Sequence, residues 1–150
     1  MKLAEALQER ADLNRKVEQL RERLHNNALV QEGDEPAEAP EELLTELDFY
    51  IDHLEELMER INRTNCMTLD NGVSITALIS KKDALLVRIK AYRELINTAS
   101  CKASRAMHSE IKVISAVNVK YLQRKLDEMC RQLRETDNRI QSLNWKTDLL

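Results

Sequence analysis

Residues 41–64, EELLTELDFYIDHLEELMERINRT, decide the fold because their apolar side chains recur at helical spacing. Steps of three and four residues connect one seam, whose members are Leu44, Leu47, Ile51, Leu54, Met58 and Ile61. Leu43, Tyr50 and Leu57 recur every seven residues beside that seam and widen it. A stripe of this width is typical of a helix with more than one neighbour, as in a bundle. The stretch therefore predicts an amphipathic helix over 41–64.

The same spacing of apolar residues predicts three more long helices, over about 3–27, 75–103 and 119–143. Asn118 is a favourable N-cap for the last of them. That helix has its own seam, and the single tryptophan follows it as a large packing anchor. The residues that we expect to form this packing or oligomer seam are Leu122, Leu126, Met129, Leu133, Ile140 and Trp145.

The residues that break helices are few and lie at the predicted connections. Both prolines and one of the two glycines fall in 28–40, ALVQEGDEPAEAP, which predicts an acidic loop because proline interrupts a helix. Asn71-Gly72 predicts a short hairpin near 66–73, since glycine permits the positive φ of such a turn. Residues 109–117 are β-branched and alternate in polarity, which favours an extended segment. The pattern leaves its pairing with the hairpin open.

The composition of the 150 residues fits the same architecture. Aromatic residues make up only 3% of the chain, so Leu, Ile, Val, Met and Ala must fill the core. These side chains suit narrow seams between helices. We therefore expect one mainly α domain over 1–150, an elongated helical bundle with coiled-coil-like packing. We also expect much of its buried surface to lie between copies of the chain.

The formal net charge of −3 is the sum of two opposed blocks. Residues 31–59 contain twelve acidic residues and no Lys or Arg, whereas 74–107 contain seven basic and two acidic residues. The basic block alone suggests a nucleic-acid or membrane surface. Only Tyr92 is interleaved for stacking on bases, and the acidic block would repel phosphates. We therefore expect the two blocks to face one another, within one chain or between neighbours.

No motif in the sequence carries a recognisable reaction. Glycine-rich phosphate loops, zinc-protease motifs and nucleophile elbows are absent, and His25, His53 and His108 are isolated. The three cysteines are about 30 residues apart, which favours reduced thiols and a cytoplasmic location. The N-terminal residues have no apolar signal segment, and no stretch is apolar enough to span a membrane. We expect no catalytic residue, cofactor or metal, and no enzymatic activity.

One group of polar residues is a candidate ligand or interaction cluster. Asparagine and arginine at the end of a helix, facing carboxylates of the acidic loop, would suit a cation or an amine. The residues are Gln31, Glu32, Asp34, Asn62, Arg63 and Asn65. The alternative is that Thr64 and Asn65 cap the helix and the loop is solvated.

Five strings of the sequence carry a resemblance to a known family. They are MKLAEALQERADL (1–13), NALVQEGDEP (27–36), INRTN (61–65), SEIKVIS (109–115) and LNWKTDLL (143–150). On these strings the chain resembles the septicolysin-like family of small bacterial proteins, largely a domain of unknown function. The resemblance implies a helical, elongated, cytosolic protein, and it assigns no catalytic or binding residue. It draws attention again to the acidic loop, to 62–65 and 110–112, and to Asn144 with Trp145.

Three functions follow as hypotheses. The first is a non-enzymatic helical protein that associates with itself through its apolar seams, and it needs no nucleic acid or membrane. The alternative is a membrane-active protein, as the name of the resembled family suggests. Its predicted apolar faces are narrow and one helix is strongly acidic, whereas interfacial helices favour Lys and Arg. The third is a small-ligand or metal-binding bundle.

Overall fold

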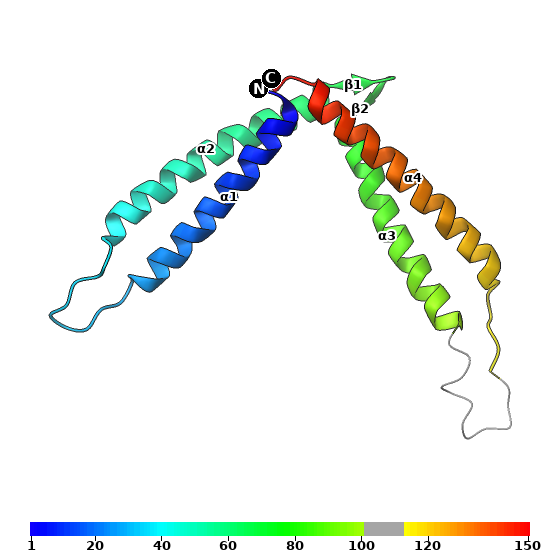
Figure 1. Cartoon of the computed structure of the whole chain (residues 1–150), viewed down its shortest axis with the longest axis horizontal. Coiled ribbons are helices and arrows are strands. Elements are labelled where there is room, and N and C mark those ends of the chain that lie inside the picture. The colour runs from blue at the N-terminus through cyan, green and yellow to red at the C-terminus, as the bar shows by residue number, and fades with distance from the viewer. Residues whose placement is uncertain (101–112) are drawn as a thin grey trace. The chain divides into compact units, whose positions relative to one another are not determined.

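The computed structural model describes residues 1–100 and 113–150 (Figure 1). This part of the chain contains four long helices and a two-stranded antiparallel sheet. Their bounds are α1 Leu3–Asn26, α2 Pro40–Met67, β1 Leu69–Asp70, β2 Val73–Ser74, α3 Ile75–Ser100 and α4 Val119–Lys146. The prediction of a mainly α protein with a short hairpin is therefore confirmed.

The chain divides into two compact units. Unit 1 comprises Met1–Ser74 and Leu143–Leu150, and unit 2 comprises Ile75–Ser142. Unit 1 thus holds α1, α2, the hairpin and the last turn of α4. Unit 2 holds α3 and most of α4. The single domain expected over 1–150 stays a prediction.

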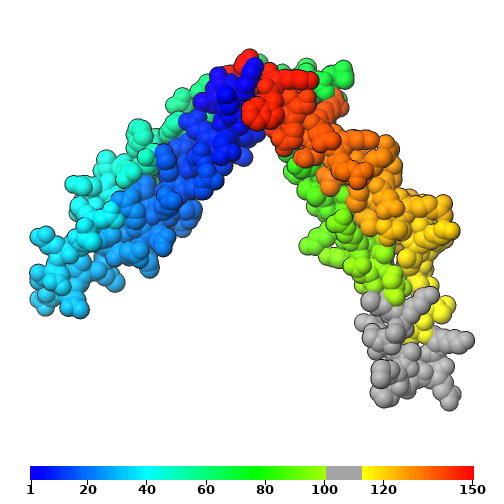
Figure 2. Space-filling view, in the orientation of Figure 1, coloured from blue at the N-terminus to red at the C-terminus, as the bar shows by residue number. Residues whose placement is uncertain are grey.

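In unit 1, α1 packs along one flank of α2, and their side chains fill the space between the two ribbons (Figure 2). Helix α1 buries residues at helical spacing: Leu3, Ala6, Leu13 and Leu20. Helix α2 buries Leu43, Leu57, Ile61 and Thr64. Removal of these apolar side chains from water is the main source of stability for the pair.

The acidic loop is tied back to the end of α1. The guanidinium of Arg23 donates from Nε to both carboxylate oxygens of Glu38, at 3.2 and 3.1 Å. The backbone N–H of Glu38 donates to the side-chain oxygen of Asn27 at 3.0 Å. Helix α1 ends at Asn26 with Asn27 as its C-cap. Helix α2 then begins at Pro40, whose missing N–H costs nothing at the first helical position.

The two ends of the described chain meet in unit 1. The N–H of Leu3 donates to the carbonyl of Thr147 at 2.9 Å, and the N–H of Leu149 donates to the carbonyl of Met1 at 3.0 Å. Lys2 forms an ion pair with Asp148, with 2.8 Å between Nζ and Oδ1. These contacts make an isolated antiparallel bridge between residues 2 and 148.

The hairpin that follows α2 forms at the predicted turn. Leu69 pairs with Ser74 and Asp70 with Val73, around a turn at Asn71-Gly72. Asn71 has φ +50° and Gly72 has φ +79°. Positive φ at both central positions is the geometry of the tight hairpin turn that Asn-Gly favours.

In unit 2, α3 and α4 share one apolar core. Its buried members are Leu85, Ile89 and Ile96 from α3 with Leu126 and Met129 from α4. The ammonium of Lys82 also contacts the carboxylate of Asp137. At the start of α4, the side chain of Asn118 accepts a bond from the N–H of Tyr121 at 3.0 Å. The predicted N-cap is therefore confirmed.

One predicted boundary needs correction, and one predicted segment is described only in part. The second helix was expected to end at about residue 64, but α2 continues to Met67, so Thr64 and Asn65 do not cap it. The reason is that Thr64 is buried and bonds within unit 1. Of the extended segment 109–117, residues 109–112 lie outside the described residues. Residues 113–117 are non-helical, which does not contradict the predicted extended segment, and they form no strand with the described hairpin.

Candidate functional site

The predicted seam of α2 lies only partly in the core of unit 1. Ile61 is buried, and Leu47 and Leu54 are half-buried. Leu44, Ile51 and Met58 are 48%, 41% and 44% exposed. Helix α1 instead covers the neighbouring flank that includes Leu43 and Leu57. The exposed residues are spaced by seven, so they form one row along α2, which we call the outer stripe.

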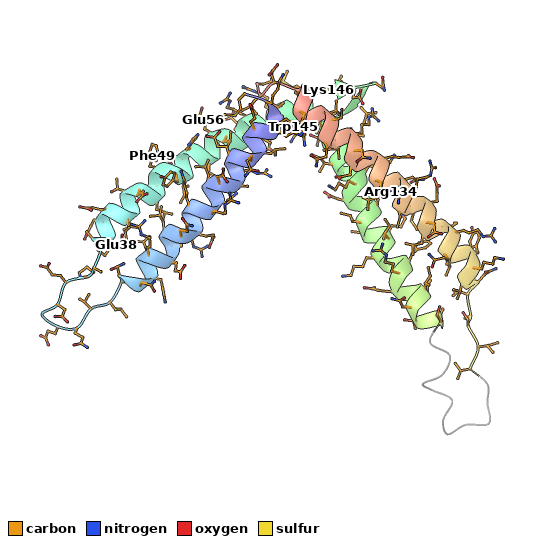
Figure 3. The ribbon with its side chains drawn as sticks, in the orientation of Figure 1. Glu38, Phe49, Glu56, Arg134, Trp145 and Lys146 are labelled. Carbon is orange, nitrogen blue, oxygen red and sulfur yellow. The ribbon has the colours of Figure 1, made fainter. Side chains whose placement is uncertain are left out.

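The seam of α4 is largely used inside unit 2. Leu126, Met129 and Ile140 are buried, and Leu122 and Leu133 are half-buried. Trp145, at the last turn of α4, is 64% exposed (Figure 3). Its neighbour Asn144 occupies the buried position instead, so Trp145 is not a core residue of the described chain, and its place in an oligomer seam stays a prediction.

The structure does not bring the six residues of the polar cluster together. Gln31, Glu32 and Asp34 lie in the loop before α2, whereas Asn62 lies 22 residues after Pro40 in the same helix. At about 1.5 Å per residue, this places the two groups roughly 33 Å apart. All six are exposed except Asn65, which is half-buried. A joint ligand role therefore has no geometric support within unit 1.

A groove between α3 and α4 combines basic and aromatic side chains. Its volume is about 430 Å³. Helix α3 supplies Arg88 and Tyr92, and α4 supplies the rest, which are Tyr121, Arg124, Lys125, Glu128, Met129 and Gln132. The whole lining belongs to unit 2. We call it the basic groove.

The electrostatics of the basic groove favour an anionic partner. Its one carboxylate, Glu128, is 2.7 Å from the guanidinium of Arg131, and hydrogen bonding to Arg131 holds the pKa of Glu128 below its usual range. The ammonium of Lys125 lies 5.0 Å from the ring centre of Tyr121, whose side-chain hydrogen bond raises the pKa of Lys125. Arg88 and Arg124 have no ion pair among the described residues. The groove thus presents three cations to solvent.

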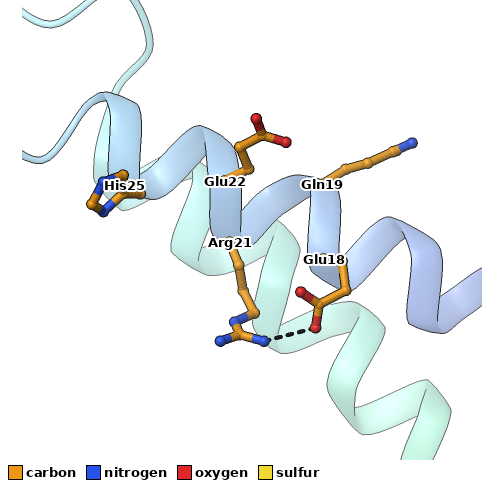
Figure 4. Close-up of a pocket in the computed structure, with 5 residues that line it drawn as sticks. All are labelled: Glu18, Gln19, Arg21, Glu22 and His25. Atoms are coloured by element: carbon orange, nitrogen blue, oxygen red, sulfur yellow. Dashed lines mark hydrogen bonds and ion pairs between the residues drawn. The ribbon is translucent and has the colours of Figure 1, made fainter.

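Two other recesses are weaker candidates for a ligand site than the basic groove. Figure 4 shows one whose five lining residues all lie on α1, where Glu18 and Arg21 pair at 2.7 Å. A single helix supplies no opposite wall. The second, of about 370 Å³, lies beside Trp145 and is lined by acidic residues of α1. Its carboxylates are engaged: Glu5 with the N–H of Lys2, Glu9 with His53, and Asp12 with Arg15.

The described residues contain neither a metal-binding cluster nor a membrane-spanning helix. Within residues 1–100 and 113–150, no group of three or more His, Cys, Asp or Glu side chains could hold a metal ion. His53 is half-buried, with its Nε2 3.4 Å from an oxygen of Glu9. None of the described helices is long and apolar enough to cross a membrane. Cys101 and His108 lie outside the described residues.

The basic groove was missed at the sequence level, where Tyr92 stood alone among basic residues. The structure adds Tyr121 from a different helix. A local signal was present, because Arg124 and Lys125 follow Tyr121 by three and four residues and so share its face of a helix. What the sequence lacked was the pairing of α3 with α4.

Comparisons with known proteins give the chain a family but no activity. The model described as a family of unknown function, DUF6847, matches residues 10–149. No curated protein matches the chain. A crystal structure described as a functionally unknown conserved protein from Corynebacterium diphtheriae is similar, with 38% identity and a TM-score of 0.93. The match covers 100% of this chain and 99% of that one.

These findings overturn the resemblance to the septicolysin-like family, because neither match carries that description. The family name attached to the five strings was wrong. The expectation of a cytolysin, which rested on that name, falls with it. On the match over 140 residues, from 10 to 149, the chain belongs to the family of unknown function DUF6847.

Proposed function

We propose that this protein is a non-enzymatic helical module that associates with itself. The observation that carries the proposal is the outer stripe of α2, where Leu44, Ile51 and Met58 remain 41–48% exposed. Isolated exposed apolar residues are ordinary on protein surfaces. A row of three at seven-residue spacing, on a helix whose other flank is already packed, is typical of a helix that lacks a neighbour.

The size of the stripe suits a reversible contact. Full burial of a Leu, Ile or Met side chain contributes about 1.5–3 kcal/mol, and these three are already half-covered. Association costs about 4–15 kcal/mol in lost freedom of motion. The stripe therefore supports association and requires further contacts beside it. We also propose a cytoplasmic location, since widely spaced cysteines suit a reducing compartment.

The variant Ile51→Asp tests the role of the stripe. Because Ile51 is exposed, the substitution places a charge on the outer stripe without opening the core between α1 and α2. We expect the wild-type chain to have at least twice the monomer mass in sedimentation equilibrium and the variant to have the monomer mass.

Phe49→Asp is the matched control. Phe49 is 66% exposed and, two residues away on α2, lies off the stripe. It should keep the wild-type mass. A wild-type chain that remains monomeric at about 100 µM, or an Ile51→Asp variant that assembles as the wild type does, would refute the proposal.

A further inference from the structure

The two units carry opposite charge. Unit 1 contains nine Lys and Arg against nineteen Asp and Glu, a net charge of −10. Unit 2 contains fourteen against seven, a net charge of +7. Charge of opposite sign on two surfaces speeds their association and selects partners. A second copy of the chain therefore presents a complement for each unit.

The outer stripe of α2 is unsuited to pairing with its own copy. Asp48, Glu55 and Glu59 lie on the solvent side of the stripe, within a turn of Leu44, Ile51 and Met58. None of the three carboxylates has an ion pair among the described residues. Two such stripes face to face would bring six carboxylates together, and opposed like charges cost several kcal/mol. The surface that covers the stripe must therefore be basic.

The basic groove has the chemistry and the length to be that surface. Arg88, Arg124 and Lys125 supply cations, while the rings of Tyr92 and Tyr121 and the side chain of Met129 supply apolar contact. Its α4 wall runs from Tyr121 to Gln132, twelve residues that span eleven helical rises, or about 16 Å. The row from Asp48 to Glu59 on α2 has the same length.

We infer that the basic groove of one copy is the docking site for the acidic outer stripe of α2 of a second copy. This inference rests on the proposed self-association and adds its specificity. Each copy holds both a stripe and a groove, so each copy can supply either side of the contact. Asp48, Glu55 and Glu59 would then meet Arg88, Arg124 and Lys125. The apolar residues of the stripe would cover the tyrosine rings.

A second copy fits the groove better than a nucleic acid does. Single-stranded nucleic acids also seek cations and aromatic rings. Each chain carries one outer stripe and one basic groove, so the two surfaces occur in equal number. The stripe also brings apolar side chains, which a phosphate backbone lacks.

Two charge-reversed full-length chains test the contact. The stripe variant carries Asp48→Lys, Glu55→Lys and Glu59→Lys. The groove variant carries Arg88→Glu, Arg124→Glu and Lys125→Glu. All six side chains are exposed, so circular dichroism should show wild-type helix content for both. Each variant alone should have a dissociation constant at least about tenfold above the wild-type value, because like charges then meet.

An equimolar mixture of the two variants should recover the mass of the wild-type pair, since each reversed stripe then faces a reversed groove. Sedimentation velocity with one variant fluorescently labelled measures this recovery. A mixture that stays monomeric would overturn the inference. A stripe variant or groove variant that assembles as the wild type does would also overturn it. If Ile51→Asp dissociates in that case, the proposed self-association stands without this docking contact. A monomeric wild type would refute both.

Matched controls separate the contact from general charge. Glu32→Lys, Asp34→Lys and Glu35→Lys make the same change of charge as the stripe variant, but in the acidic loop. Lys120→Glu with Arg134→Glu reverse two cations of α4 outside the groove, and Figure 3 labels Arg134. Both control chains should assemble normally. Dissociation of a control would overturn the inference. A labelled single-stranded oligonucleotide whose binding the groove variant abolishes, with the mass of the pair unchanged, would assign the groove to nucleic acid instead.

Discussion

Thr64 is a polar side chain with no exposed surface, and its two hydrogen bonds join two distant parts of unit 1. Its hydroxyl donates to the carbonyl of Arg60 at 2.8 Å and accepts from the N–H of Leu150 at 3.0 Å. Arg60 adds a bond from its Nε to the carbonyl of Leu150 at 3.0 Å. The buried hydroxyl of Thr64 thus both donates and accepts a hydrogen bond, and the bond from Leu150 fixes the C-terminal residues against α2.

We predict that Thr64→Val destabilises unit 1 by about 1–3 kcal/mol, because the N–H of Leu150 loses its acceptor while the volume is conserved. Urea unfolding followed by circular dichroism measures the change. Thr45→Val is the control, since Thr45 is exposed and, within residues 1–100 and 113–150, its hydroxyl bonds to the carbonyl of Glu41 in the same helix. Equal effects of the two substitutions would show that the contact with Leu150 contributes nothing.

At the scale of elements, the apolar pattern predicted the four helices of the described residues, and Asn71-Gly72 predicted the hairpin, because spacing and turn chemistry are local properties. It could not decide which flank of α2 meets α1. Leu44 and Leu43 are adjacent in sequence and lie one step apart around the helix, so both flanks satisfy helical periodicity. The flank of α2 that becomes buried depends on the side chains of the neighbouring helix, which the local pattern of α2 does not contain. The basic groove was hidden for the same reason, since its walls come from α3 and α4.

The connection between α1 and α2 predicts a pH dependence. Hydrogen bonding from Arg23 holds the pKa of Glu38 below its usual range. The folded state thus favours the carboxylate, and its contribution to stability is present above pH about 4.5 and is lost as the pH falls further. We predict that Glu38→Gln loses less stability than the wild type between neutral pH and pH about 3.

Thermal unfolding at several pH values measures this difference. Glu35→Gln is the matched control, because Glu35 lies in the same loop, is exposed, and has no ion pair among the described residues. Parallel pH profiles for the wild type and Glu38→Gln would contradict the prediction.

At the scale of the whole molecule, the division into two units determines which helices lose stability when one region is altered. Unit 1 is closed by contacts from residues 147–150, and these residues bond to Met1, Leu3, Arg60 and Thr64. Unit 2 has its core between α3 and α4, at Leu85, Ile89 and Leu126. The two cores share no residue, so a loss in one need not spread to the other.

We predict that deletion of residues 147–150 lowers the hydrogen-exchange protection of amides in α1 and α2, because the bonds to Met1, Leu3 and Thr64 are removed. Amides around Leu85–Ile89 and Leu126 should keep wild-type protection. Exchange measured by mass spectrometry on peptides from each helix reports both. A uniform loss over all four helices would contradict the independence of the units.

The bridge between residues 2 and 148 also orders events in time during synthesis. Helices α1 and α2 emerge from the ribosome before unit 2, and they can pair as soon as both have emerged. Their last hydrogen-bond partners, from Thr147 to Leu150, are translated after the whole of unit 2. At about 5–20 residues per second, the nascent unit 1 waits several seconds for them. During that interval its outer stripe is exposed, and the carboxylates of Asp48, Glu55 and Glu59 disfavour contact between two such stripes because like charges repel.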